Sequence, residues 1–110
     1  MIKYVAAIFF ILFQTQASIA SQEGIASWYN DTRTASGERF NPNAMTCAHK
    51  KLPFGTLVTV TGANGRTIVC RVNDRGPYVK GRVIDLTHRA AKELGILQRG
   101  LMKVTLVTAI

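Results

Sequence analysis

Acidic side chains are scarce in this sequence. Six Asp and Glu residues face fourteen Lys and Arg residues, which leaves a formal net charge of +8 at pH 7. A charge of this sign attracts anionic partners, although a basic surface that only keeps the protein soluble is the alternative. Nucleic acid would match the charge, but the export signal described next leads us to expect none as a partner.

Apolar runs long enough to cross a membrane are also missing. The N-terminal run from Val5 to Phe13 covers nine residues, or about 14 Å of helix, whereas a bilayer core is about 30 Å thick. Lys3 precedes this run and Ser18 to Ala20 follow it, an order typical of a signal peptide with its cleavage site. We therefore expect residues 1–20 to be a signal peptide, with an uncleaved anchor as the alternative. Residues 21–110 would then form one domain, exported to the periplasm or cell-wall space, monomeric and without stable membrane insertion.

Cysteine is nearly absent, and Cys47 and Cys70 are the two examples. In an oxidising compartment such a pair favours a disulfide, which would constrain the unfolded chain by about 3 kcal/mol. A metal site is the alternative, because one residue separates Cys47 from His49, but no second pair lies at the spacing typical of zinc ligands. We therefore expect a disulfide, no metal and no cofactor.

Short β-rich runs recur along the sequence. Leu57 to Thr61 and Arg66 to Val72 flank Asn64-Gly65, whose tolerance of positive φ angles predicts a hairpin. Thr87 as N-cap and Gly95 after the last turn would bound a helix. The other expected elements are strands at 24–29, 82–86 and 102–108, a polar loop at 30–43 and a short helical turn at 44–51. Five or so strands with one helix predict a small closed barrel, because closure removes exposed strand edges.

Two aspartates, Asp74 and Asp85, each follow a short apolar run. Asp74 ends a strand and begins a Gly-Pro turn, so its side chain can face a groove; a turn aspartate that bonds its own backbone is the alternative. Asp85 lies inside an apolar strand, where burial would raise its pKa and suit a general acid. A structural partner for Arg71 or Arg82, or a cap at the helix end, is the alternative for Asp85.

Five blocks in order resemble the rare lipoprotein A family. They are Ala26-Ser27-Trp28-Tyr29, Thr34-Ala35-Ser36-Gly37-Glu38, Ala48-His49-Lys50-Lys51-Leu52-Pro53-Phe54-Gly55, Val72-Asn73-Asp74-Arg75-Gly76-Pro77-Tyr78 and Gly81-Arg82-Val83-Ile84-Asp85-Leu86. The resemblance implies a mainly β fold, the six-stranded double-psi β-barrel. It also implies an endolytic lytic transglycosylase that cuts the glycan of peptidoglycan stripped of its stem peptides.

The resemblance also implies roles for particular residues. Asp74 matches an aspartate treated as catalytic, and Asp85 matches the aspartate assigned to glycan chemistry in expansins and related cellulases. We therefore expect Asp74 to be the leading acid–base group and Asp85 its partner. His49 matches a histidine thought to matter for activity, with a structural hydrogen bond as the alternative. Glu38 lies in the loop expected to line the groove, with a solvated loop glutamate as the alternative. The residues expected to hold the glycan, which bears lactyl and peptide carboxylates, are Arg75, Tyr78, Lys80, Arg82 and Trp28. Of the two aromatic residues, we expect Trp28 to be mostly core and Tyr78 to face the groove.

Three departures from the family bear on this interpretation. No cysteine lies near residue 20, so we expect no lipid anchor, and we expect no sporulation-related repeat domain in this chain. Asn41 stands where members frequently have an aspartate, which argues against a catalytic role for that position. The competing interpretation is a non-catalytic, expansin-like module that binds and loosens wall glycan. A secreted partner or inhibitor module is a third.

Overall fold

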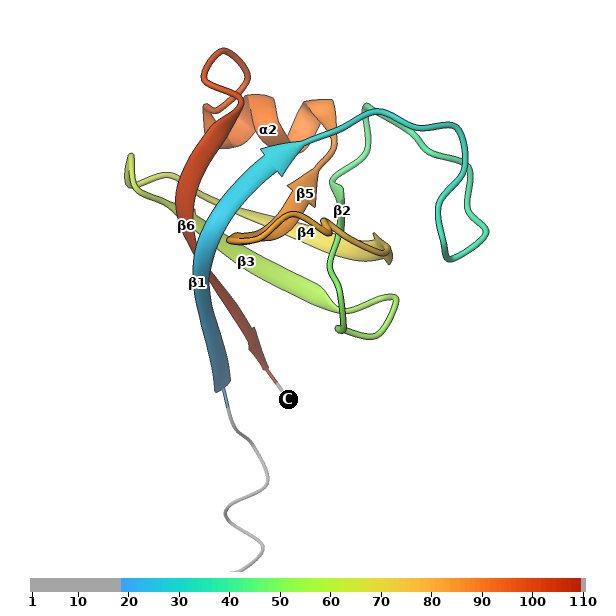
Figure 1. Cartoon of the computed structure of the whole chain (residues 1–110), viewed down its shortest axis with the longest axis horizontal. Helices are drawn as coiled ribbons and strands as arrows, with labels where there is room; N and C mark the ends of the chain where they lie inside the picture. The colour runs from blue at the N-terminus through green and yellow to red at the C-terminus, as the bar shows by residue number, and fades with distance from the viewer. Residues whose placement is uncertain (1–18, 110) are drawn as a thin grey trace, which may run out of the picture.

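The computed structural model describes residues 19–109, in which six strands close on one another in the order β1-β5-β2-β4-β3-β6 (Figure 1). The elements are β1 (Ile19–Trp28), β2 (Thr46–Ala48), β3 (Leu57–Gly62), β4 (Thr67–Asp74), β5 (Arg82–Leu86), α2 (His88–Leu94) and β6 (Leu101–Ala109). The expected signal peptide falls on residues outside this description, except for Ile19 and Ala20, which belong to β1. The predicted mainly β, closed six-stranded barrel is confirmed.

The predicted hairpin is β3 followed by β4. Val60 pairs with Ile68 in an antiparallel ladder, and Gly65 takes a φ of 85° in the turn between the strands. Glycine adopts this left-handed conformation without the steric cost that a Cβ would bring. Alternation along β4 places Ile68, Cys70 and Val72 on the buried face, as the period-2 pattern predicts.

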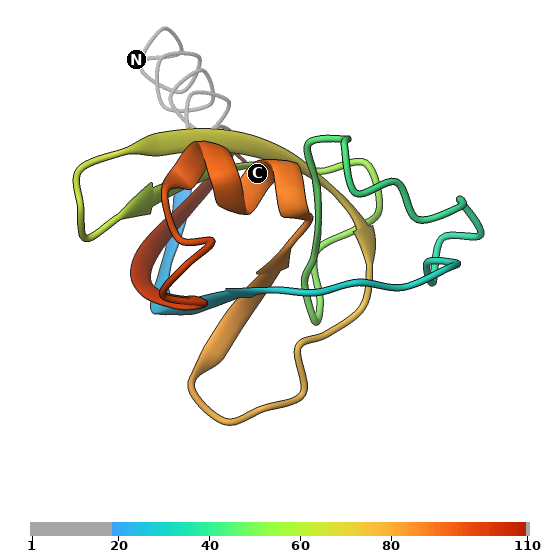
Figure 2. The ribbon, with the colours of Figure 1, turned by 90° about the horizontal axis from the view of Figure 1, so that it is seen from above.

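Helix α2 lies over one end of the barrel (Figure 2). Thr87 is the N-cap, since its hydroxyl accepts a hydrogen bond from the backbone N–H of Ala90, and Gly95 ends the helix with a φ of 88°. These are the two residues from which the helix bounds were predicted. Ala90, Ala91 and Leu94 join the barrel core, so the helix closes the interior at this end. Within residues 19–109, no helix has the length and apolar character needed to cross a bilayer.

The disulfide between Cys47 and Cys70 joins β2 to β4 inside the core, with the two Cα atoms 5.9 Å apart. The predicted pairing is therefore confirmed. Burial of both residues protects the bond from solvent thiols and ties the three-residue strand β2 to the long hairpin.

Two local predictions are wrong. The segment 44–51 is not a helical turn, because Thr46 to Ala48 form β2, which pairs with β4 on one side and β5 on the other. Three residues are too few to show strand alternation, so tertiary pairing decided this element. Trp28 is not a core residue: it is 36% exposed, and its ring meets His88 edge-on, with the ring centroids 5.5 Å apart.

Candidate active site

A β-bulge brings Asp74 to the face of the barrel on which Asp85 lies. Cys47 of β2 pairs with Val72 and with Leu86, and all three residues are fully buried on the inner face. The next residue, Ala48, pairs with Asp74 on β4 and with Asp85 on β5.

One step along β2 therefore matches two steps along β4, which makes Asn73 the extra residue of a bulge. Simple alternation would have turned Asp74 inward with Val72, whereas the bulge turns it outward with Ala48. A second register shift lies on β5, where Ile25 and Ala26 of β1 pair with Arg82 and Ile84. Asp74, Ala48 and Asp85 therefore form one row across the outer face.

Three donors hold the carboxylate of Asp74. Its Oδ1 accepts hydrogen bonds from the backbone N–H groups of Ala35, at 2.8 Å, and Arg75, at 2.9 Å. Its Oδ2 accepts a hydrogen bond from the Tyr29 hydroxyl at 2.7 Å. The side chain is 7% exposed, so its orientation is set by β1, by the long loop and by its own turn. The turn contact with Arg75 is the one that the structural alternative predicted.

Tyr29 is the site residue for which the sequence offered no clear signal. Its ring meets the buried Phe40 at a centroid distance of 4.9 Å, while its hydroxyl reaches Asp74. Burial, followed by the hydrogen bond and the charge of Asp74, holds the pKa of the Tyr29 phenol far above its usual value. Tyr29 is therefore a fixed hydrogen-bond donor.

Asp85 is less enclosed than Asp74 and sits beside Ser27. The Ser27 hydroxyl donates a hydrogen bond to Oδ1 of Asp85, and the two residues pair across β1 and β5. Burial raises the pKa of Asp85, and the charge of Asp74 adds to this rise. The Ser27 hydrogen bond and the charge of Arg82 act in the opposite direction. Asp85 is thus partly buried, with a pKa that its burial raises.

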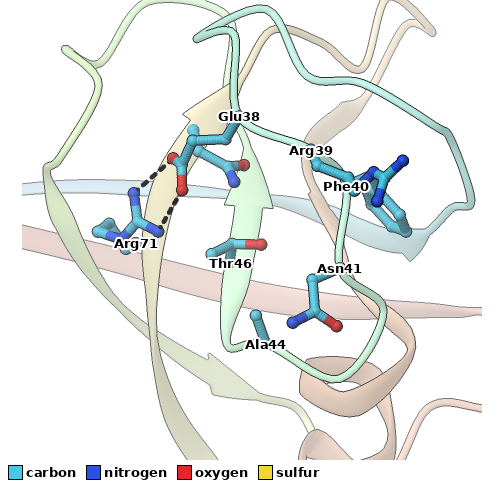
Figure 3. Close-up of a pocket in the computed structure, with 8 residues that line it drawn as sticks. Glu38, Arg39, Phe40, Asn41, Ala44, Thr46 and Arg71 are labelled. Carbon is cyan, nitrogen blue, oxygen red and sulfur yellow. Dashed lines mark hydrogen bonds and ion pairs between the residues drawn. The ribbon is translucent and has the colours of Figure 1, made fainter.

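Glu38 and Arg71 flank a groove of about 510 Å³ under the long loop (Figure 3). The two Arg71 nitrogens Nη1 and Nη2 bind the Glu38 carboxylate at 2.7 and 3.0 Å, so Arg71 is not a partner of Asp85. The hydrogen bond from Arg71 lowers the pKa of Glu38. The groove is lined by Glu38, Arg39, Phe40, Asn41, Ala44, Thr46, Arg71 and Asn73.

His49 follows β2 and is bonded through both ring nitrogens. Its Nδ1 accepts hydrogen bonds from the backbone N–H groups of Lys51 and Leu52, at 3.0 and 3.1 Å. The proton therefore lies on Nε2, which donates to Oε1 of Gln22 at 2.9 Å. Burial lowers the pKa of His49, and the nearby cations reinforce this effect. These contacts fit the structural role left open for His49 and leave no ring nitrogen for either aspartate.

The cationic residues that lie between Asp74 and Asp85 in sequence occupy different places in the structure. Arg75 folds back over the Phe54 ring, 4.0 Å from its centroid, and donates to the carbonyl oxygens of His49 and Leu52 at 3.2 and 2.9 Å. Arg82 lines a second groove, of about 420 Å³. Lys80 and Tyr78 lie on the exposed loop, where Tyr78 is 77% exposed. Arg75 therefore supports the fold, whereas the other three side chains remain open to a ligand.

The row of Asp74, Ala48 and Asp85 lies between the two grooves. Thr46 and Arg71 pair with each other two residues before Ala48 along β2, on the side of the first groove. Arg82 precedes Asp85 on β5, which runs antiparallel to β2, so it lies beyond the row in the other direction. The lining residues of the two grooves do not include Asp74 or Asp85 themselves.

The sequence is similar to known proteins of one family. A model of the family described as "Lytic transglycolase" matches residues 21–106. The probable endolytic peptidoglycan transglycosylase RlpA of Synechocystis sp. is 56% identical over 88 residues, covering 76% of this chain and 27% of that protein. The endolytic peptidoglycan transglycosylase RlpA of Pasteurella multocida is 48% identical over 90 residues, covering 77% and 31% respectively. The chain thus spans about a quarter to a third of the length of these relatives.

Two solved structures share the fold. The Streptomyces papain inhibitor superposes with a TM-score of 0.67 at 25% identity, covering 83% of this chain and 94% of that one. A variant of the Clavibacter michiganensis expansin, in complex with cellohexaose, superposes with a TM-score of 0.65 at 22% identity, covering 81% and 50%. Both neighbours have the double-psi β-barrel that the resemblance implied.

Proposed function

This chain belongs to the lytic transglycolase family, and from that premise we propose that it is an endolytic lytic transglycosylase of peptidoglycan. The reaction would cut the glycan strand without water and leave a 1,6-anhydro-muramyl end. The observation that carries the proposal is the row in which Asp74 and Asp85 flank Ala48 on one outer face. Two carboxyl groups in different environments are what acid–base chemistry at a glycosidic bond requires.

Asp85 is the better placed of the two for the first proton transfer. Burial raises its pKa, which favours the protonated form that a general acid needs. Asp85 would give its proton to the glycosidic oxygen as the bond from that oxygen to C1 breaks. The C6 hydroxyl of the same sugar then attacks C1, and its proton returns to Asp85. The sum is one bond broken, one bond formed and the acid restored.

Asp74 would stabilise the positive charge that develops on the reacting sugar. All three of its hydrogen bonds use its oxygens as acceptors, as an ionised carboxylate does. A fixed negative charge in this row would stabilise the oxocarbenium-like centre at C1 and also raise the pKa of Asp85. The role first expected of Asp74, that of the leading acid–base group, passes in this proposal to Asp85.

Glu38 and His49 would support the site without transferring protons. Glu38 is paired with Arg71 in the first groove, where both can bind sugar hydroxyls. His49 holds the segment 49–52 against Gln22 and so shapes the second groove. The glycan would run from one groove to the other, across the aspartates.

The test is product analysis with purified protein and wall glycan stripped of peptides. We expect anhydro-sugar ends, identified by mass, from the native protein and none from an Asp85→Asn variant that still binds sacculi. Glycan binding with no anhydro product from the native protein would support the expansin-like alternative. Protein that neither binds sacculi nor yields product would support the inhibitor or partner module.

Export belongs to the same proposal. A wall-cutting domain acts outside the cytoplasm, which fits residues 1–20 as a signal peptide and a monomeric domain in the periplasm or cell-wall space. N-terminal sequencing of the protein recovered from the periplasm tests this directly: a start at Ser21 supports it, and an intact Met1 contradicts it.

A further inference from the structure

The second groove has cationic side chains but no acidic one. Its lining includes Lys50, Lys51 and Arg82, together with the apolar Leu52 and Val83. Among residues 19–109, ion pairs join Arg71 to Glu38 and Arg89 to Glu93, and none involves these three cations. Residues 1–18 contain no acidic side chain to neutralise them.

The geometry of the groove is held from several directions. His49 accepts hydrogen bonds from the backbone N–H groups of Lys51 and Leu52. These bonds fix the segment that carries the two lysines. Arg75 donates to the carbonyl oxygen of Leu52 at 2.9 Å and anchors the same segment from the other side. The cations are thus presented on a rigid backbone, which lowers the entropy lost when a ligand binds.

The positive charge at the groove also changes the pKa values of neighbouring residues. The charges of Arg75, Lys50 and Lys51 add to burial in lowering the pKa of His49. The charge of Arg82 lowers the pKa of Asp85, so the groove lies within electrostatic reach of the candidate acid. Leu52 and Val83 add an apolar surface, the kind on which the C–H face of a sugar ring packs.

We propose that this groove, formed by Lys50, Lys51 and Arg82 around Leu52 and Val83, binds the free carboxylate of a sugar in the glycan strand. The inference rests on the proposed function for the identity of the strand, and it adds the recognition of a carboxylated sugar in that strand. Gln22 contributes an amide beside the cations for a sugar hydroxyl. A carboxylate here would also offset the charge of Arg82 and so favour the protonated form of Asp85. Binding of the carboxylated sugar would therefore change the acidity of Asp85.

The test compares two tetrasaccharides of wall glycan, one with free lactyl carboxylates and one with the same groups converted to carboxamides. We expect the native protein to bind the carboxylate form about ten-fold more tightly in calorimetry at low salt, and less selectively at high salt. The double variant Lys50→Gln/Lys51→Gln should bind the two forms with nearly equal affinity. The matched control Lys92→Gln/Lys103→Gln removes two exposed lysines elsewhere and should keep the preference.

Equal binding of the two forms by the native protein, or an unchanged preference in the Lys50/Lys51 double variant, would overturn the inference. The binding assay separates this result from the fate of the proposed function. A carboxylate preference without anhydro products supports the groove and contradicts the enzyme, whereas anhydro products without a preference support the enzyme and contradict the groove. Titration of the native protein with the carboxylate form, followed by the NMR chemical shifts of the backbone amides of Lys51 and Arg82, provides a second check on where the carboxylate binds. This check requires no variant.

Discussion

The hydroxyl of Tyr29 lies 2.7 Å from the carboxylate of Asp74, which joins the end of β1 to the end of β4. The two residues are 45 positions apart in sequence, and the long loop between β1 and β2 contributes a third partner through the N–H of Ala35. Asp74 is therefore both a candidate site residue and one of the points at which the loop is held to the barrel.

Replacing Tyr29 by Phe tests the first of these roles. The ring and its packing on Phe40 stay, but Asp74 loses one donor, and hydrogen bonds to charged groups are worth about 1.5–3 kcal/mol. We expect the melting temperature to fall measurably and the rate of anhydro-product formation to fall about ten-fold. Tyr78→Phe, at an exposed hydroxyl, is the control for stability and should melt like the native protein. Native-like rates in Tyr29→Phe would show that the hydroxyl plays no part in positioning Asp74.

The pH dependence of cleavage should follow Asp85. Its pKa is raised by burial, so the protonated form persists to a higher pH than for an exposed aspartate, and activity is lost as pH rises through that value. Ser27→Ala removes a hydrogen bond that lowers this pKa. We expect the alkaline limb of the rate profile to move to higher pH in Ser27→Ala. A shift to lower pH, or none, would contradict the assignment of Asp85 as the acid.

The free energy of unfolding should also depend on pH through Asp85, and the sign of this dependence follows from the direction of the pKa shift. Between the ordinary and the raised pKa of Asp85, the folded protein holds a proton that the unfolded chain has released. The free energy of unfolding contributed by this group therefore falls as pH rises through that window. Urea titrations across the window should show this slope in the native protein and lose it in Asp85→Asn.

Removing the disulfide tests what stabilises so small a barrel. Cys47 and Cys70 are separated by 23 positions, a loop for which closure constrains the unfolded chain by about 3 kcal/mol. We expect Cys47→Ser/Cys70→Ser to lower the melting temperature by roughly 10 °C or more, as followed by circular dichroism. Reduction of the native protein under denaturing conditions, followed by refolding in dithiothreitol, should give the same loss.

Replacing Gly24 of β1 by Ala tests how closely β1 and β5 approach each other. A Cβ added at Gly24 would clash with Cγ1 of Val83, the bulge residue next to Arg82. We expect Gly24→Ala to cost about 1–3 kcal/mol in chemical denaturation and to disturb the row that contains Asp85. Ser21→Ala, on the exposed start of the same strand, should be neutral, and an equally stable Gly24→Ala would show that β5 can move aside without loss.

Local chemistry along the chain determined much of this protein. Asn64-Gly65 marks the hairpin, Thr87 and Gly95 bound the helix, and the ordered blocks around Asp74 and Asp85 identify the family. Each of these depends on a few adjacent residues and their preferred backbone angles, so the sequence contains the information. The same holds for the disulfide, since two cysteines allow a single pairing.

Tertiary structure alone decided which face the aspartates share and what surrounds them. Alternation along β4 would have sent Asp74 inward, and only the bulge at Asn73, set by pairing with β2, turns it toward Asp85. The strand β2 itself, the exposure of Trp28 and the bond from Tyr29 to Asp74 likewise arise from segments far apart in sequence. Register and burial are properties of paired strands, and no single run of residues encodes them.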